Sequence, residues 1–278
     1  MTKPCAGRVA FVTGASRGIG AAIAERLAAA GAAVAATARS VDSHPPGLPG
    51  TVCDTVARIE ARGGRALPLR CDVFDPASCA AAVAQCREAL GPIDILVNNA
   101  AAGPYRPFEK LSLRDFEVTF AANVRAPLLL VQLVAPDMRA RRRGWIVNVS
   151  SATAEPPQGP PYAAWEREGG MHLYAASKAA LNRLTLGLAA ELAADGVAVN
   201  TLAPVAAVLT PGVEALGATR WIEPSMIEPI EAIAEAALAL ATCDAATTGR
   251  ITYSLPLLQE LAREVRALDG QTVLEAGR

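Results

Sequence analysis

The chain is poor in aromatic and charged residues. Of its 278 residues, 4% are aromatic and 19% are charged, whereas 52% are hydrophobic. Its interior must therefore consist mainly of Ala, Val, Leu and Ile, and the length is enough for one large α/β domain. The formal net charge of −1 excludes a general attraction to nucleic acid or to an anionic membrane, so we expect neither as a partner. The one basic cluster, at 139–144, is explained by favourable charge at a helix end.

Signals for metal binding, disulfides and secretion are also missing. The chain has two histidines and six cysteines, none of them in a CxxC pair, at positions 5, 53, 71, 79, 86 and 243. We therefore expect no metal site and expect reduced thiols. The N-terminus leads into an apolar strand without a signal-peptide core, and no uninterrupted apolar run is long enough to cross a bilayer. These features predict a cytoplasmic protein with no membrane span.

Short apolar runs typical of strands alternate with helical patterns. The strand-like runs fall at 8–14, 33–38, 65–73, 93–100, 144–151, 197–204 and 249–254. The helical patterns fall at 19–32, 51–64, 75–91, 112–140, 172–194 and 230–242. Strands that are apolar throughout and separated by helices are typical of a parallel sheet with both faces covered. The sequence predicts an α/β protein, a single domain over 1–278 with a Rossmann-type doubly wound parallel sheet of about seven strands. Its core would be 7–254, followed by a helical tail at 255–278.

A glycine-rich segment, "TGASRGIG" at 13–20, lies between the first predicted strand and the first predicted helix. Glycines allow a sharp turn and close approach to an anion, which the free N–H groups of the following helix also bind. The G-x-x-x-G-x-G spacing differs from the common G-x-G-x-x-G fingerprint, and a tight structural turn is the alternative. Its position after the first strand favours dinucleotide binding. The expected contact residues are Gly14, Ala15, Ser16, Arg17, Gly18, Ile19 and Gly20.

The end of the second predicted strand bears on which dinucleotide is bound. An acidic residue there would bind the ribose hydroxyls of NAD(H), but the strand ends in Ala38, Arg39 and Ser40. Arg39 could bind a 2′-phosphate through its forked guanidinium, and Arg17 could approach from the other side. The alternative is that both arginines are simply solvated. We favour NADP(H) over NAD(H).

The stretch "YAASK" places Tyr174 and Lys178 one helical turn apart on one face. Such a pair can be a solvated contact worth a few tenths of a kcal/mol, roughly 0.3 kcal/mol, or part of a catalytic site. The stretch alone does not decide between these readings.

Several separated motifs together resemble the short-chain dehydrogenase/reductase family over nearly all of residues 7–254. They are "TGASRGIG", "CDV" (71–73), "NNA" (98–100), Asn123 in "AANVRAP", "VNVSS" (147–151), "YAASK" and "NTLAP" (200–204). Within the family, the segments around 41–52 and 63–73 are most similar to hydroxysteroid-dehydrogenase-like proteins and citronellol-type dehydrogenases.

The resemblance implies a catalytic set of Ser151, Tyr174 and Lys178, with Asn123 completing a proton relay. Tyr174 would exchange a proton with the substrate oxygen, and acting as a base needs its pKa lowered by about 3 units from ~10. Lys178 and an oxidised nicotinamide would favour the phenolate, Lys178 would also bind the nicotinamide ribose, and Ser151 would bind the substrate oxygen. Further implied cofactor contacts are Asp72, Val73, Asn98, Ala100, Pro204 and Thr210.

The chain departs from the family pattern in three places. Ala101 stands where glycine is usual, and Val205 follows Pro204 where glycine is usual. Tyr174 lies 23 positions after Ser151, so 154–173 is an insertion on the substrate side; it includes the competing phenol Tyr162 and Trp165. Ser150 is an alternative to Ser151, because strand alternation decides which serine faces the cofactor.

The leading hypothesis is an NADP(H)-dependent oxidoreductase that interconverts an alcohol and a ketone or aldehyde on an apolar small molecule. The alternative is a catalytically impaired NADP(H)-binding regulatory protein, which the departures at Ala101 and Val205 and the insertion would favour. By resemblance, and because two long predicted helices could pack against a second copy, we expect a homodimer or homotetramer.

Overall fold

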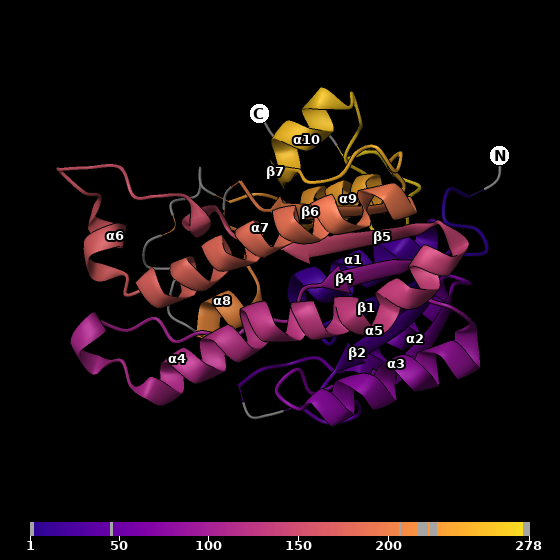
Figure 1. Cartoon of the computed structure of the whole chain (residues 1–278), viewed down its shortest axis with the longest axis horizontal. Coiled ribbons are helices and arrows are strands. Elements are labelled where there is room, and N and C mark those ends of the chain that lie inside the picture. Colours follow the sequence, from indigo (N-terminus) through magenta and orange to yellow (C-terminus); the bar gives the residue numbers. More distant parts are fainter. Residues whose placement is uncertain (1–2, 45–46, 206, 216–221, 223–226, 275–278) are drawn as a thin grey trace.

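A seven-stranded parallel sheet forms the centre of the protein (Figure 1). The structure is a computed structural model that describes residues 3–44, 47–205, 207–215, 222 and 227–274. The strand order is β3-β2-β1-β4-β5-β6-β7, and every neighbouring pair is parallel. This confirms the predicted doubly wound sheet. The strands are β1 (Val9–Thr13), β2 (Ala33–Ala38), β3 (Arg65–Arg70), β4 (Ile95–Asn98), β5 (Gly144–Val149), β6 (Val197–Ala203) and β7 (Ile251–Tyr253).

Helices cover both faces of the sheet, and each face has its own apolar cluster. Side chains alternate along a strand, so Val12 of β1 faces one cluster and Phe11 faces the other. The first cluster packs against α1 (Gly18–Ala29), α2 (Val52–Ala61), α9 (Ile230–Leu240) and α10 (Ser254–Glu260). The second packs against α3 (Pro76–Leu90), α5 (Ala126–Arg141) and α7 (His172–Leu192). The remaining helices are α4 (Leu113–Phe120), α6 (Ala164–Glu168) and α8 (Pro211–Ala215), with short helical turns η1 (Phe108–Lys110), η2 (Ala121–Arg125), η3 (Ala152–Ala154) and η4 (Ala193–Asp195).

The helix predicted at 112–140 is one continuous helical run, but it is not regular. The turn η2 is π-helical and separates α4 from α5, with Pro127 at the start of α5. Single π-helical turns inside α-helices are frequent at functional sites, and this one carries Asn123. The whole run Leu113–Arg141 is long and apolar enough to cross a membrane, and it is the one such helix among the described residues. Half of its most apolar window is buried inside the fold, as expected for the core helix of a globular domain.

Over its described part, 255–274, the predicted helical tail is helical only at its start. Helix α10 ends at Glu260, and the chain then turns and forms an isolated bridge between Arg266 and Val273. This part of the tail is held by a buried carboxylate, Glu235 of α9, which pairs with Arg26 at 2.6 Å and Arg263 at 2.5 Å. Ion pairing, which helical periodicity does not reveal, fixes these turns against α1 and α9.

Arginines of the basic cluster at 139–144 form ion pairs with carboxylates of other segments of the chain. Asp94, which precedes β4 and is 2% exposed, pairs with Arg141 at 2.5 Å and Arg143 at 2.8 Å. Arg139 pairs with Asp195 at 2.7 Å. These arginines therefore neutralise carboxylates within the fold, and an anion-binding role is not needed to explain them.

Candidate active site

The sheet order reverses between β1 and β4, and the glycine loop follows β1 at this point. In open α/β sheets the crevice at such a reversal is the usual place for a ligand. The loops after β4, β5 and β6 leave the same edge of the sheet, because all strands are parallel. The motifs that are scattered along the sequence are thus brought to one edge.

The glycine loop has the geometry of an anion cradle. Gly14 has a φ of +68° and Gly18 of +54°, a region that other residues rarely adopt. A Cβ on Gly20 would lie 2.4 Å from the carbonyl oxygen of Gly14, so this close approach requires glycine. Helix α1 begins after Arg17 without a side-chain cap, which leaves its first N–H groups suited to an anion. These residues fit the diphosphate of a dinucleotide.

The other residues of the loop are held by the protein. The N–H of Ala15 donates to the carbonyl oxygen of Thr37 at 3.0 Å, and its own carbonyl oxygen accepts from the Thr55 hydroxyl at 2.8 Å. Ser16 is buried, and Ile19 packs against the apolar cluster on the α1 side of the sheet. The loop is therefore fixed in shape by contacts behind it.

Arg17 of the glycine loop lies near Arg39, the residue that follows β2. Arg17 donates from Nε to the carbonyl oxygen of Pro49 and from Nη2 to that of Gly50, both at 2.8 Å. Burial and then the charge of Arg39 lower the pKa of Arg17, so the two guanidinium groups repel each other. Arg39 is exposed, and its guanidinium carbon lies 5.3 Å from the ring centre of Phe74. A bound anion between the two arginines would relieve their repulsion.

The segment after β3 forms a turn that contains two of the predicted cofactor contacts, Asp72 and Val73. The N–H of Asp72 donates to the Ser78 hydroxyl at 3.0 Å, and its carboxylate accepts from the N–H of Phe74 at 3.1 Å. Val73 is half-buried. The carboxylate of Asp72 thus shapes this turn, which also brings Phe74 against Arg39.

In the Asn-Asn-Ala motif, the second asparagine supports the glycine loop. Asn99 donates from Nδ2 to the carbonyl oxygen of Thr13 at 2.9 Å, and the N–H of Ala100 donates to the Thr13 hydroxyl at 3.0 Å. Asn98 is 3% exposed and donates to Oδ1 of Asn148 at 2.8 Å. The expected contact of Asn98 with the cofactor is therefore limited to its backbone, because its side chain lies inside the sheet.

Ser151, and not Ser150, adjoins the Tyr174 phenol. The Ser151 hydroxyl hydrogen-bonds to Tyr174 and accepts from the Thr153 hydroxyl at 2.9 Å. Ser150 is 4% exposed, and its hydroxyl has no partner among the described residues. This contact favours Ser151 over Ser150 as the serine beside the phenol, and its catalytic role stays a prediction.

Tyr174 and Lys178 are not a solvated surface pair. Lys178 is 2% exposed, donates from Nζ to the carbonyl oxygen of Val149 at 2.8 Å, and lies 5.6 Å from the ring centre of Tyr174. Burial lowers the pKa of Lys178 from 10.5 to about 8. Tyr174 is half-buried, and its pKa is raised by burial first and by Tyr105 second, while its hydrogen bond with Ser151 opposes the rise. Within the protein alone, burial outweighs the effect of Ser151, so the pKa of Tyr174 lies above its ordinary value; the lowering expected when an oxidised nicotinamide is bound stays a prediction.

Asn123, at the π-helical turn, holds the loop that follows β4. Its amide accepts from the N–H of Ala102 at 2.9 Å and donates to the carbonyl oxygen of Ala102 at 2.8 Å. It also donates to the Ser177 hydroxyl at 2.9 Å, which in turn donates to the carbonyl oxygen of Tyr174 at 2.7 Å. Its side chain thereby links the loop to helix α7.

Two residues beside Tyr174, Tyr105 and Gly103, were not predicted from the sequence. The rings of Tyr105 and Tyr174 meet edge to face, with centres 5.7 Å apart and planes at 60°. A Cβ on Gly103 would lie 3.0 Å from the Tyr174 ring. Both stand in "AAGPYRP" after β4, where only the aromatic residue could have been a signal. Tyr162, the competing phenol, is 46% exposed.

The segment after β6 lies beside the glycine loop. A Cβ on Gly18 would lie 3.1 Å from the methyl carbon of Thr210, so Thr210 is close to the anion cradle. Pro204 is half-buried, and the N–H of Val205 donates to the buried carboxylate of Glu228 at 2.9 Å. Neither departure from the family pattern needs a glycine here. The backbone of Val205 is held by its hydrogen bond to Glu228, and Ala101 does not adopt a positive φ.

The family profile described as short chain dehydrogenase matches residues 8–221. The chain belongs to the short-chain dehydrogenase family. It is 33% identical over 260 residues to hydroxysteroid dehydrogenase-like protein 2 of Xenopus laevis, an alignment that covers 93% of this chain. The chain spans only 59% of the length of that relative. It is also 36% identical to gluconate 5-dehydrogenase of Gluconobacter oxydans, covering 71% of this chain and 70% of the relative.

Among solved structures, this short-chain dehydrogenase is similar to a metagenomic short-chain oxidoreductase that was crystallised in complex with NADP. The identity is 33%, the TM-score is 0.69, and the alignment covers 90% of this chain and 96% of the other. The family membership and the sheet thus agree with the resemblance seen in the motifs.

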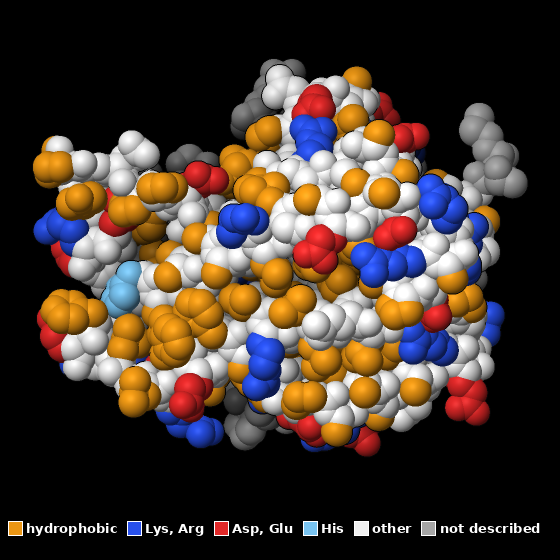
Figure 2. Space-filling view, in the orientation of Figure 1, with side chains coloured by type: hydrophobic (Ala, Val, Ile, Leu, Met, Phe, Trp, Pro, Cys, Tyr) orange, Lys and Arg blue, Asp and Glu red, His pale blue; other side chains and the backbone are white. Residues whose placement is uncertain are grey.

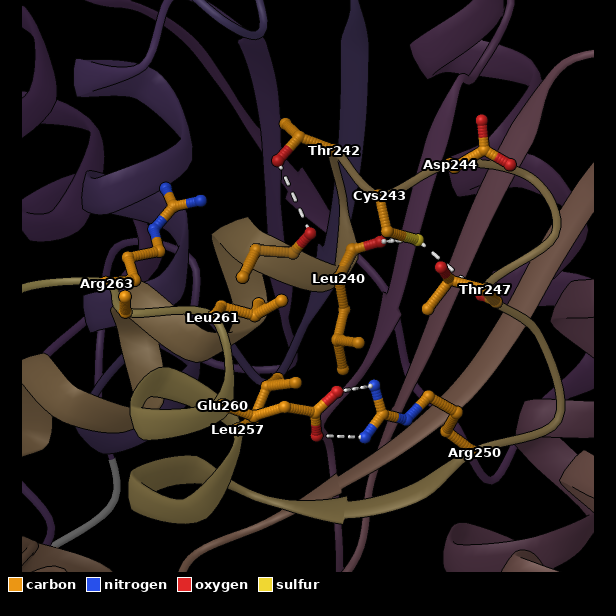
Figure 3. Close-up of a pocket in the computed structure, with 12 residues that line it drawn as sticks. Leu240, Thr242, Cys243, Asp244, Thr247, Arg250, Leu257, Glu260, Leu261 and Arg263 are labelled. Atoms are coloured by element: carbon orange, nitrogen blue, oxygen red, sulfur yellow. Dashed lines mark hydrogen bonds and ion pairs between the residues drawn. The ribbon is translucent and has the colours of Figure 1, made fainter.

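A cavity of about 560 Å³ lies away from these residues, between the end of α9, the segment 242–250 that follows it, and α10 with the residues after it (Figure 3). Arg250 and Glu260 pair across one side of it at 2.9 and 2.5 Å. Cys243 is in its wall, and burial raises the pKa of this thiol to about 11, so the thiol stays protonated at neutral pH. None of the sequence-predicted site residues lines this cavity.

Proposed function

We propose that this short-chain dehydrogenase is an NADP(H)-dependent oxidoreductase that interconverts an alcohol and a ketone or aldehyde. The observation that carries the proposal is the assembly of Ser151, Tyr174 and Lys178 at one edge of the sheet. Ser151 bonds to the phenol, and Lys178 is buried beside its ring. A simple helix-surface pair would need neither contact.

The roles of these residues follow from their protonation states. A bound nicotinamide cofactor would donate or accept the hydride. The raised pKa of Tyr174 keeps its phenol protonated at neutral pH, which suits a proton donor to a carbonyl oxygen. Ser151 would donate a hydrogen bond to the same oxygen, where negative charge develops. The protonated phenol suits carbonyl reduction, and alcohol oxidation would need the pKa of Tyr174 to fall when the oxidised cofactor binds.

NADP(H) is the proposed cofactor. The glycine loop fits the diphosphate, and Arg17 and Arg39 offer two cations where a 2′-phosphate would lie. The similar metagenomic oxidoreductase was crystallised with NADP. Lys178, which already donates one N–H to Val149, has further donors for the nicotinamide ribose. Thr210 would close over the cofactor from the segment after β6.

An apolar substrate is proposed because one aromatic ring packs against the catalytic phenol and the substrate-side insertion carries another. Tyr105 packs against Tyr174, and the insertion contributes Trp165, which is half-buried. A polyhydroxylated acid would instead need several polar partners. The test is NADPH oxidation with two matched panels, one of apolar ketones and aldehydes and one of keto sugar acids. Turnover of the first panel alone supports the proposal. Turnover of the second alone overturns the substrate class, and tight NADPH binding with no turnover favours the regulatory alternative.

The proposed oligomer is a homodimer or homotetramer. Leu113 and Phe116 of α4 are 84% and 50% exposed, and Leu186 of α7 is 37% exposed. Hydrophobic side chains gather over the region where α4 and α7 lie side by side (Figure 2). Apolar surface of this kind is typical of an interface. Multi-angle light scattering should give a mass of at least two chains, and a monomer at micromolar concentration would contradict the proposal.

A further inference from the structure

The backbone of the loop 101–107, which precedes η1, is hydrogen-bonded at Ala102 and at Arg106, and contacts to the catalytic phenol fall between these points; the Arg106 side chain also pairs with Asp115 of α4 at 3.1 Å. At its start, Asn123 bonds both the N–H and the carbonyl oxygen of Ala102. At its end, the N–H of Arg106 donates to the carbonyl oxygen of Gly170 at 3.0 Å. The second anchor comes from the insertion 154–173 and not from the common core of the sheet.

The part of the loop between the anchors rests on Tyr174. The edge-to-face contact of Tyr105 has a ring separation of 5.7 Å, within the range in which aromatic pairs attract. Gly103 lies so close to the Tyr174 ring that an added Cβ would be 3.0 Å from it. A shift of the loop would therefore change the surroundings of the phenol directly.

The insertion itself is held at both of its ends. Near its start, Glu155 accepts a hydrogen bond from the Tyr253 hydroxyl of β7 at 2.6 Å. Near its end, Gly170 is buried and has a φ of +66°. A Cβ on Gly170 would lie 2.6 Å from the backbone nitrogen of Arg106, so the contact between the insertion and the loop requires glycine at this position.

We propose that the insertion 154–173 positions the catalytic phenol: the contact of Gly170 with Arg106 holds the loop 101–107 so that Tyr105 keeps the Tyr174 ring in its reactive orientation. Tyr105 is then a positioning residue that acts through Tyr174. The inference rests on the proposed role of Tyr174 as the proton donor. The raised pKa of Tyr174, to which Tyr105 contributes, agrees with this contact.

The first test compares Gly170→Ala with Gly63→Ala. Gly63 has a φ of +74°, similar to that of Gly170, but an added Cβ there would meet nothing within 4 Å. The two variants therefore share the backbone strain and differ in the lost contact. We expect Gly170→Ala to lower kcat by about tenfold or more, because small misplacements of catalytic groups are costly. The Kd for NADPH should stay as in Gly63→Ala. Equal kcat in the two variants would overturn the proposal.

The second test changes Tyr105 and remains decisive where Gly170→Ala does not fold. Tyr105→Leu removes the ring and should lower kcat, whereas Tyr105→Phe keeps the ring and should stay close to the wild type. If the ring had only a structural role, Tyr105→Leu would lower the stability of the fold, and kcat would not differ between Tyr105→Leu and Tyr105→Phe. Loss of kcat in Tyr105→Phe as large as in Tyr105→Leu would contradict a positioning role of the ring.

A third readout does not depend on turnover. The chain has four tyrosines, so a protein labelled with ¹³C at the tyrosine ring gives few signals, and Tyr174→Phe assigns that of Tyr174. Gly170→Ala and Tyr105→Leu should move this signal, and Gly63→Ala should leave it in place. An unmoved signal would overturn the proposal. A wild type without turnover would refute the proposed function, and the signal would still decide whether the insertion positions this ring.

Discussion

The ammonium nitrogen of Lys178 lies 5.6 Å from the centre of the Tyr174 ring and donates to the carbonyl oxygen of Val149 at 2.8 Å. The lysine is therefore a fixed group in a dry setting, unlike a mobile surface charge. Its low pKa and the raised pKa of Tyr174 have the same main cause, which is burial of both groups. At neutral pH the phenol is therefore uncharged, whereas Lys178 still carries its charge but loses its proton at a lower pH than an exposed lysine does.

The burial of Lys178 predicts a pH dependence of stability. The pKa of the lysine falls from 10.5 to about 8 on folding, so between these values the unfolded chain binds more protons than the folded one. The free energy of unfolding should therefore rise with pH in this window, relative to Lys178→Met, by about 2 kcal/mol between pH 8 and 10. Below about pH 7, where the lysine is protonated in both states, the difference between the two proteins should be constant.

Urea denaturation of both proteins at several pH values measures this difference. Subtracting the variant cancels the buried thiols, whose raised pKa values act in the opposite direction, as for Cys5 and Cys86. A difference that does not change between pH 8 and 10 would show that the lysine has an ordinary pKa.

The two adjacent serines predict opposite outcomes. Ser151→Ala removes the hydroxyl that bonds to the Tyr174 phenol and should lower kcat about 100-fold, as loss of an oxyanion donor does. Ser150→Ala removes a buried hydroxyl with no partner among the described residues and should leave kcat unchanged. Steady-state kinetics with a carbonyl substrate compares the two. A larger loss in Ser150→Ala would reverse the assignment.

The arginines beyond β2 predict cofactor choice. Arg39→Ala should weaken NADPH binding about 10- to 100-fold, because a charge-assisted contact with a phosphate is lost. NADH binding should not change, since it lacks the 2′-phosphate. Isothermal titration calorimetry with NADPH and with NADH measures both dissociation constants. The control is Arg114→Ala, which removes an exposed arginine of α4. Equal weakening for both cofactors would show that Arg39 does not read the phosphate.

The succession of strands and helices along the chain and the doubly wound parallel sheet could be predicted from the sequence, and so could the motifs that this sheet brings to one edge. Apolar runs separated by helices identify a parallel sheet, and its topology then brings Gly14, Ser151 and Tyr174 to one edge. These patterns are local, and packing of the core does not alter them. The spacing of Tyr174 and Lys178 also predicts that they share one face of a helix, and both lie on α7.

Other features depend on contacts between distant segments and leave no periodic signal. The N–H of Arg106 meets Gly170, 64 positions later, and nothing in either local sequence indicates this contact. The π-helical turn at Asn123 interrupts a pattern that reads as one regular helix. The direction of the pKa shift of Tyr174 depends mainly on how deeply the phenol is buried, which only the packed site determines.

The most direct test of the proposed site is single-turnover reduction of a carbonyl by Tyr174→Phe loaded with NADPH. We expect hydride transfer to slow by about 1000-fold or more, because the proton donor is lost, while the Kd for NADPH changes little. Burial of the ring keeps the fold, since phenylalanine has the same shape without the hydroxyl. Hydride transfer at the wild-type rate in Tyr174→Phe would contradict the assignment of Tyr174 as the proton donor and with it the catalytic set.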